Sequence, residues 1–217
     1  MMIGKIKQFN FKSLLILNTF ALIVTSYFFK NFIFLGVYTL FFFISLFTTK
    51  NGLKTIKKLN LLQNIRTEGP SNHFKKSNTP TMGGIFMIIP FLIFLLIITI
   101  NFGSLKLLLL LFTIFGFFIT GFLDDYLSIK KKENTGLKTK EKLILQSVIS
   151  IIFILLAYEK NLISPLITVS DSWAINMNIF ILPISFLVLV GISNSVNLTD
   201  GLDGLAAGCS GIVFYGL

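Results

Sequence analysis

Two adjacent carboxylates, Asp124 and Asp125, stand where the apolar stretch 105–123 gives way to polar residues. Neighbouring acids raise each other's affinity for a proton unless a cation lies between them, and a lone carboxylate at the edge of a hydrocarbon layer is costly. Mg²⁺ prefers one or two carboxylates together with phosphate oxygens. The pair therefore indicates a site for a metal and a phosphate, and the alternative is a pair of solvated acids at a helix end.

A second polar cluster lies in NSVNLTDGLDGL (194–205), directly after another apolar stretch. Its polar members recur every third residue: Asn194, Asn197, Asp200 and Asp203. They converge best if a helix tightens or unwinds there, which the glycines of the segment allow. Packing between membrane helices is the alternative. That alternative leaves two acids without a cation, because residues 161–217 contain no Lys or Arg, so we predict a functional site.

A third cluster is GPSNHFKKSNTPTMGG (69–84), which leads from a basic segment into an apolar one. Lys76 and Thr81 lie on either side of Pro80, close to the start of a predicted helix. A helix N-terminus with Lys and hydroxyl groups nearby suits a phosphate. An ordinary capped helix start is the alternative.

The elements that carry these clusters are predicted to be membrane-spanning helices. The chain is 54% apolar with 13% charged residues, whereas soluble domains have about 25% charged residues. In lipid only a helix or a closed barrel satisfies its own backbone. The apolar stretches are 13–29, 32–47, 82–102, 105–123, 143–158, 179–196 and 204–217. We therefore predict one all-α, polytopic transmembrane bundle over residues 1–217 with six or seven spans, the first two stretches being either two spans or one span and an interfacial helix.

The polar loops predict the orientation. The segments 48–80 and 124–142 are rich in Lys, whereas the alternate loops are not, and Lys-rich loops are cytoplasmic. Counting spans then places 197–203 on the same side, so the three clusters share the cytoplasmic face. The same rule accounts for the net charge of +10 without a nucleic-acid partner, and we predict none.

The clusters together predict a reaction class. One Cys and one His in the whole chain exclude a disulfide framework and a zinc site of the usual kind. Several acids for a metal and several lysines for a diphosphate favour phosphoryl transfer, in which positioning and charge neutralisation supply most of the catalysis. The substrates would be a phosphorylated lipid and a charged soluble donor.

On three strings, in this order and spacing, the chain resembles the bacterial phospho-N-acetylmuramoyl-pentapeptide transferases, a branch of the polyprenyl-phosphate sugar-1-phosphate transferases. The strings are GPSNHFKKSNTPTMGG, GFLDDY followed by TGLKTKEK, and NSVNLTDGLDGLAAG. The resemblance implies a multi-pass enzyme of the bacterial cytoplasmic membrane. It would transfer phospho-MurNAc-pentapeptide from UDP-MurNAc-pentapeptide to undecaprenyl phosphate, forming lipid I and UMP for peptidoglycan synthesis. Mg²⁺ as cofactor and a homodimer are implied as well.

Residue roles follow from the same resemblance. Asp124 and Asp125 match the catalytic acidic pair, and one of them is expected to accept the proton of the lipid phosphate. The matched substrate-binding positions are Lys76, Thr81, Asn197, Asp200 and Asp203. The matched metal ligands are Asp124, Asp125, Asp200 and Asp203.

The sequence also departs from the family pattern. The family implies about ten spans, a further catalytic aspartate and a His-rich loop, and none of these additional features is matched in this chain. We therefore expect either part of a longer or split enzyme or the product of a decayed gene. The alternatives are a related GlcNAc-1-phosphate transferase and a non-catalytic membrane protein that binds polyprenyl phosphate.

Overall fold

A computed structural model of the chain describes residues 32–59, 61, 81–133, 135–170, 173–200 and 205–216. By their contacts these residues belong to two units. The first unit contains the start of helix α2 (Phe32–Lys58) and, from Ala207 onwards, helix α7 (Leu205–Gly216). The second unit, Ser45–Ala206, contains everything between them and carries the candidate site. The single membrane domain expected for residues 1–217 stays a prediction.

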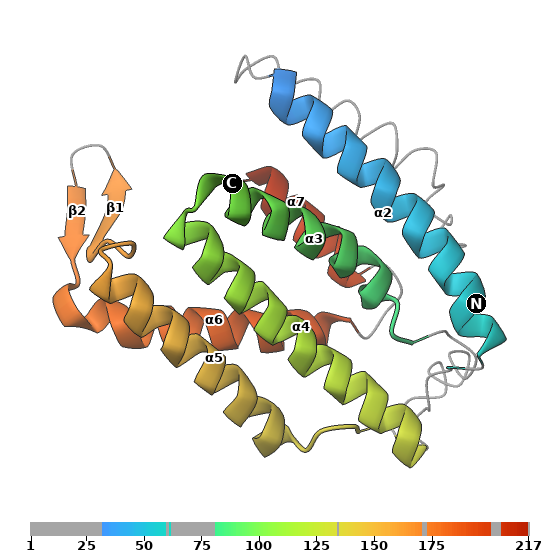
Figure 1. The fold of residues 1–217 in the computed structure, drawn as a ribbon. Helices are drawn as coiled ribbons and strands as arrows, with labels where there is room; N and C mark the ends of the chain where they lie inside the picture. Colours follow the sequence, from blue (N-terminus) through green and yellow to red (C-terminus); the bar gives the residue numbers. More distant parts are fainter. Residues whose placement is uncertain are drawn as a thin grey trace, which may run out of the picture. The chain divides into compact units, whose positions relative to one another are not determined.

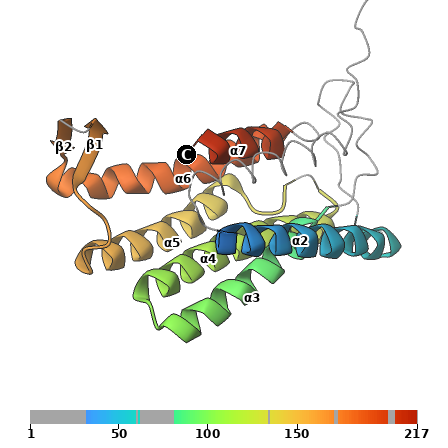
Figure 2. The ribbon, with the colours of Figure 1, turned by 90° about the horizontal axis from the view of Figure 1, so that it is seen from above.

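Within the described part of the chain, four helices of the second unit are long and apolar enough to cross a membrane. They are α3 (Gly84–Phe102), α4 (Leu105–Lys131), α5 (Thr139–Glu159) and α6 (Ile181–Thr199), which follows the 3-10 turn Asn178–Phe180. Figures 1 and 2 show α4 between α3 and α5, with α6 packed against α5. The all-α, polytopic membrane class is confirmed. The predicted stretch 13–29 lies outside the described residues.

The turn between α3 and α4 explains why these two helices are antiparallel neighbours. Gly103 ends α3 with φ +56°, and its N–H donates to the carbonyl of Thr99 at 3.0 Å. Glycine reaches this left-handed conformation without the steric cost that a Cβ brings. Only Gly103 and Ser104 separate the two helices, so the chain reverses within two residues.

The helices extend beyond the apolar stretches that predicted them. Helix α2 continues to Lys58 and α4 to Lys131, so the first residues of the predicted polar segments 48–80 and 124–142 are helical, and the cytoplasmic location of these segments stays a prediction. Lys is a good helix former, and lysines in the last turn interact favourably with the helix dipole. Hydropathy marks where lipid ends and not where a helix ends. Between α4 and α5 the described residues 132–133 and 135–138 are non-helical.

A short hairpin between α5 and α6 was not predicted. Strands β1 (Leu166–Ser170) and β2 (Trp173–Asn176) pair antiparallel, with Ile167 opposite Ile175. Figure 1 shows the hairpin beside the start of α6. β-Branched residues favour strands, but five residues are too few for the periodicity of the sequence to separate a strand from a loop.

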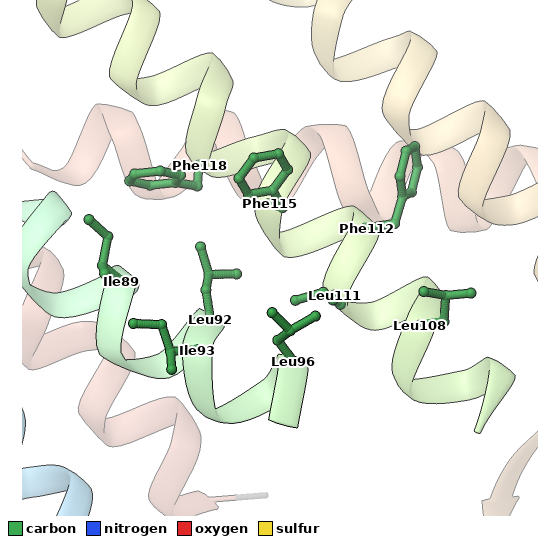
Figure 3. A pocket seen from close by; sticks show the side chains of 9 residues that line it. All are labelled: Ile89, Leu92, Ile93, Leu96, Leu108, Leu111, Phe112, Phe115 and Phe118. Atoms are coloured by element: carbon green, nitrogen blue, oxygen red, sulfur yellow. The ribbon is translucent and has the colours of Figure 1, made fainter. Parts of the chain in front are cut away.

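Between α3 and α4 lies an apolar cavity of about 530 Å³ (Figure 3). Figure 3 shows the side chains of the two helices facing each other across it. The lining residues are Ile89, Leu92, Ile93, Leu96, Leu108, Leu111, Phe112, Phe115 and Phe118. The buried polar residues of these helices are satisfied locally, since Thr99 and Thr113 donate to carbonyls one turn back at 2.7 and 2.8 Å. This part of the unit is therefore a lipid-compatible wall and offers no polar chemistry.

Candidate functional site

A polar cavity of about 340 Å³ lies where α4, α5, α6 and the start of α3 meet. Its polar walls are formed by Asp124, Asp125, Lys142, Asn197 and Asp200. Met82, Gly84 and Ile85 contribute the wall at the start of α3. The structure thus brings together residues from all three clusters that the sequence singled out, although they are up to 118 positions apart along the chain (82 to 200).

Lys142 is the cation of this cavity. Its Nζ lies 2.9 Å from Oδ2 of Asp124, and the two side chains are 16% and 25% exposed. The pair joins α5 to α4 across 18 residues of sequence. An ion pair so largely removed from water is much less screened than a surface pair. Lys142 therefore neutralises the charge of Asp124. Its side chain also lines the cavity, where it can contact an anion.

The connection 132–138 holds Asp124 from the other side. The backbone N–H of Leu137 donates to Oδ1 of Asp124 at 3.0 Å, and Lys131 Nζ donates to the carbonyl of Gly136 at 2.7 Å. Gly136 packs directly on the backbone of α4, and a Cβ there would collide with the carbonyl of Asp124. The connection is thus a clamp on α4, and both carboxylate oxygens of Asp124 accept a hydrogen bond.

The first turn of α5 places Lys142. Glu141 Oε2 accepts the backbone N–H of Lys138 at 2.9 Å, which satisfies one of the free donors at the helix start. The backbone N–H of Lys142 donates to the carbonyl of Lys138 at 3.0 Å and begins the helical ladder. Lys142 is therefore held in the first full turn of a helix whose positive dipole end lies beside the cavity.

Asp125 faces the start of α3. Its hydrogen-bond partners are the backbone of Met82 and the side chain of Thr81. Met82 has the unusual φ of +65° for a residue with a side chain, and such conformations persist only where surrounding contacts hold them. The N–H of Thr81 in turn donates to the carbonyl of Leu61 at 3.2 Å. The predicted substrate-binding residue Thr81 thus lies against the predicted catalytic residue Asp125.

A second cavity of about 300 Å³ adjoins the first and shares Lys142, Asn197 and Asp200 with it. Thr120, Gln146 and Ser193 add further polar groups to its wall. Asn197 lies in the last turn of α6, whereas Asp200 has left the helical conformation, with ψ +26°. The helix therefore ends within the predicted polar cluster, and the backbone turns between two of its members.

The donor chemistry suits a hard cation in part. Asp125, Asp200 and the amide of Asn197 offer oxygen atoms in the lining of the cavity, which is the ligand type that Mg²⁺ takes. Within the described ranges, no three His, Cys, Asp or Glu side chains form a group that could hold a metal ion. Two further predicted site residues, Lys76 and Asp203, lie outside those ranges. The metal site therefore stays a prediction.

Sequence reasoning overlooked three residues that shape this site. From the sequence, Lys142 is one of several lysines assigned to orientation and to a diphosphate; Gly136 and Gln146 have no assigned role there, and Gln146 lies within an apolar stretch. The string TGLKTKEK held a signal for the first two, because it follows the acidic pair at the start of the next helix. A lone Gln in a spanning segment is the corresponding signal for the third, since polar groups are rare there.

Apolar helices that end in a shared cavity with acidic and basic walls define a polytopic membrane protein with a polar cavity at the helix ends. A family model described as glycosyl transferase family 4 matches residues 107–217. The chain belongs to this family. A signature described as phospho-N-acetylmuramoyl-pentapeptide-transferase signature 1 matches residues 76–88, which include Thr81 and the start of α3.

Curated relatives point to the same branch. The chain is 88% identical over 216 residues to a phospho-N-acetylmuramoyl-pentapeptide-transferase of Prochlorococcus marinus (strain MIT 9301), in an alignment that covers 100% of this chain and 60% of the relative. A protein of the same name from Halalkalibacterium halodurans is 42% identical over 161 residues, 73% of this chain and 50% of the relative. The resemblance predicted from the three strings is confirmed. The chain spans about 60% of the length of the first of these relatives.

Proposed function

We propose that the protein transfers phospho-MurNAc-pentapeptide from UDP-MurNAc-pentapeptide to undecaprenyl phosphate. In this reaction a phosphate oxygen of the lipid attacks the phosphorus that carries the sugar. A new P–O bond forms, the bond from that phosphorus to the bridging oxygen breaks, and UMP leaves with the electron pair. The products are UMP and lipid I, a precursor of peptidoglycan and hence of cell-wall growth, cell shape and division.

The observation that carries the proposal is the cavity shared by Lys142, Asp124, Asp125, Asn197 and Asp200. Transferring phosphoryl groups need positive charge beside their oxygens and a fixed orientation of both substrates. Lys142 supplies the charge and Asp124 holds it in place. Asp125, which lies beside Thr81 and Met82, is the carboxylate that would take up a proton from the lipid phosphate, because Asp124 is ion-paired with Lys142 and a neighbouring cation favours the ionised form of a carboxyl group.

Mg²⁺ is part of the proposal. Asp125 and Asp200 would hold it together with Asn197 and with Asp203, since their oxygens are the ligands that Mg²⁺ takes. When bound, the ion would neutralise charge on the diphosphate of the donor.

The membrane arrangement is also proposed. The Lys-rich ends of α2, α4 and the start of α5 favour the cytoplasmic side of the bacterial inner membrane for the cavity. The nucleotide donor would enter from the cytosol and the lipid phosphate from the bilayer. The resemblance alone suggests a homodimer.

A direct test measures UMP release. The purified protein, and a fusion of residues 1–217 to the C-terminal part of the 88% identical relative, are incubated with UDP-MurNAc-pentapeptide, undecaprenyl phosphate and Mg²⁺. We expect release in at least the fusion, and its loss on the order of 100-fold in Asp125→Asn. Glu159→Gln is the matched control, because Glu159 is exposed on α5 and pairs with the neighbouring Lys160 at 3.0 Å.

Four results would count against the proposal. Unchanged turnover in Asp125→Asn removes the role of that carboxylate. Turnover with UDP-GlcNAc in place of the MurNAc donor supports the related GlcNAc-1-phosphate transferase. Binding of undecaprenyl phosphate without UMP release in either protein supports the non-catalytic alternative, as does a stop directly after codon 217 in an inactive chain.

A further inference from the structure

A buried polar link joins α5 to α6 inside the membrane-spanning region. Gln146 on α5 is 2% exposed. Its Nε2 donates to Oγ of Ser193 at 3.2 Å, and its Oε1 accepts from Nδ2 of Asn194 at 2.8 Å. The second hydrogen of that Nδ2 is directed to the carbonyl of Val190, also at 2.8 Å. The side chain of Gln146 thus bridges two successive residues of α6 with a donor and an acceptor.

This link does something that apolar packing cannot. Elsewhere on α5 the buried positions include Ile154 and Ala157, and apolar contacts of that kind tolerate small shifts along a helix. A buried amide loses its hydrogen bonds if either helix slides or turns, and an unpaired polar group in a low-dielectric interior is costly. The link therefore fixes one register and one rotation of α6 against α5.

The link lies one turn from the site on both helices. Lys142 precedes Gln146 by four residues and Asn197 follows Asn194 by three, which is about 6 and 4.5 Å along the helix axes. Asp200 follows three residues later, where the helix has just ended. Gln146 and Ser193 themselves line the second cavity beside these three residues. A shift at the link would therefore be passed directly to the polar wall.

We propose that Gln146 is a positioning residue that sets Asn197 on α6, and Asp200 directly after it, against Lys142 on α5. It acts through the backbone of α6 and touches no reacting atom. The inference rests on the proposed function only for its turnover measurement, because the placement of α6 can be measured without any substrate.

Hydrogen exchange tests the placement. The protein is reconstituted in lipid nanodiscs and amide exchange is followed over residues 196–200, where the N–H of Asp200 donates to the carbonyl of Val196 at 3.2 Å. In Gln146→Leu we expect exchange of this last turn to accelerate on the order of tenfold, with exchange of α3 unchanged. Ser150→Ala is the matched control: Ser150 is 0% exposed on α5, and in the described part of the chain its hydroxyl has no hydrogen-bond partner. The amides of the Ser150→Ala protein should exchange at the same rates as those of the unsubstituted protein.

A length swap separates positioning from general stability. Gln146→Asn shortens the link and Asn194→Gln lengthens it, so each single variant should speed exchange and lower UMP release on the order of tenfold. The double variant retains two amide side chains of the original combined length. It should therefore recover most of the slow exchange and most of the UMP release. The swap also decides the matter if Gln146→Leu does not fold.

The inference is overturned if Gln146→Leu exchanges and turns over like the unsubstituted protein, or if the double variant is no better than the single ones. An unsubstituted protein and fusion that release no UMP count against the proposed function alone. The exchange measurements then still decide the positioning role.

Discussion

Lys142 Nζ and Asp124 Oδ2 lie 2.9 Å apart and form the contact that joins the acidic end of α4 to the first turn of α5. Because Asp124 also accepts the N–H of Leu137, the carboxylate is oriented by two donors from one connecting segment and the helix that follows it. Asp124 is therefore fixed in place by the protein, while Asp125 beside it bonds to the start of α3. The two neighbouring acids have different surroundings, which is what a division of roles requires.

Lys142→Met is expected to lower UMP release on the order of 100-fold, since it removes the cation from the cavity and leaves Asp124 without its partner. Lys142→Arg keeps the charge and should retain part of the activity. The matched control is Lys140→Met, because Lys140 is exposed in the same turn. Steady-state release of UMP by each variant checks this. Equal activity in Lys142→Met and Lys140→Met would show that the cation has no part in the reaction.

Gly136→Ala is expected to open the clamp on Asp124. The added Cβ would collide with the backbone carbonyl of Asp124, so the segment must move and the bond from Leu137 is lost. We expect unfolding to become easier by about 1–3 kcal/mol, together with reduced turnover. Thermal unfolding in detergent and UMP release measure the two effects. Gly121→Ala is the control for stability, because nothing lies within 4 Å of the Cβ it would add; a Gly136→Ala protein as stable as this control contradicts the clamp.

Gly121→Leu is expected to fill the site without disturbing the fold. Gly121 lines both polar cavities, and the space around its missing Cβ is open. The larger side chain should compete with substrate for volume and raise KM on the order of tenfold, with little change in thermal stability. Gly191→Leu adds the same side chain at an exposed position of α6 with open space around it. Equal KM values for the two variants would show that substrate does not enter these cavities.

Gly52→Leu is expected to separate the end of α2 from α3. A Cβ at Gly52 would enter the ring of Phe86, and the nearby Thr48 hydroxyl donates to the carbonyl of Phe86 at 2.7 Å. Overpacking of this kind costs about 1–3 kcal/mol, seen as a lower thermal midpoint. Adding Phe86→Ala to Gly52→Leu should recover part of the loss, because the two residues are in contact. Gly36→Leu, on an open part of α2, should have no effect, and a double variant without recovery would contradict the contact.

The sequence by itself determined the class of protein and singled out three acids that line the polar cavity. Apolar stretches long enough for a bilayer require helices, because lipid offers the backbone no other hydrogen-bond partner. Acids beside such stretches, at Asp124, Asp125 and Asp200, are too costly to be incidental. These arguments use only local composition, and they needed no knowledge of how the helices pack.

Only the tertiary structure decided which residues meet. That Lys142 pairs with Asp124 depends on how residues 135–138 fold onto α4. The Gln146 link depends on the crossing of α5 and α6, and the fit of Gly52 against Phe86 on the packing of α2 on α3. Each of these contacts joins residues that are distant along the chain or lie on different helices. Which residues pair depends on how the helices pack, and no single stretch of sequence contains that information.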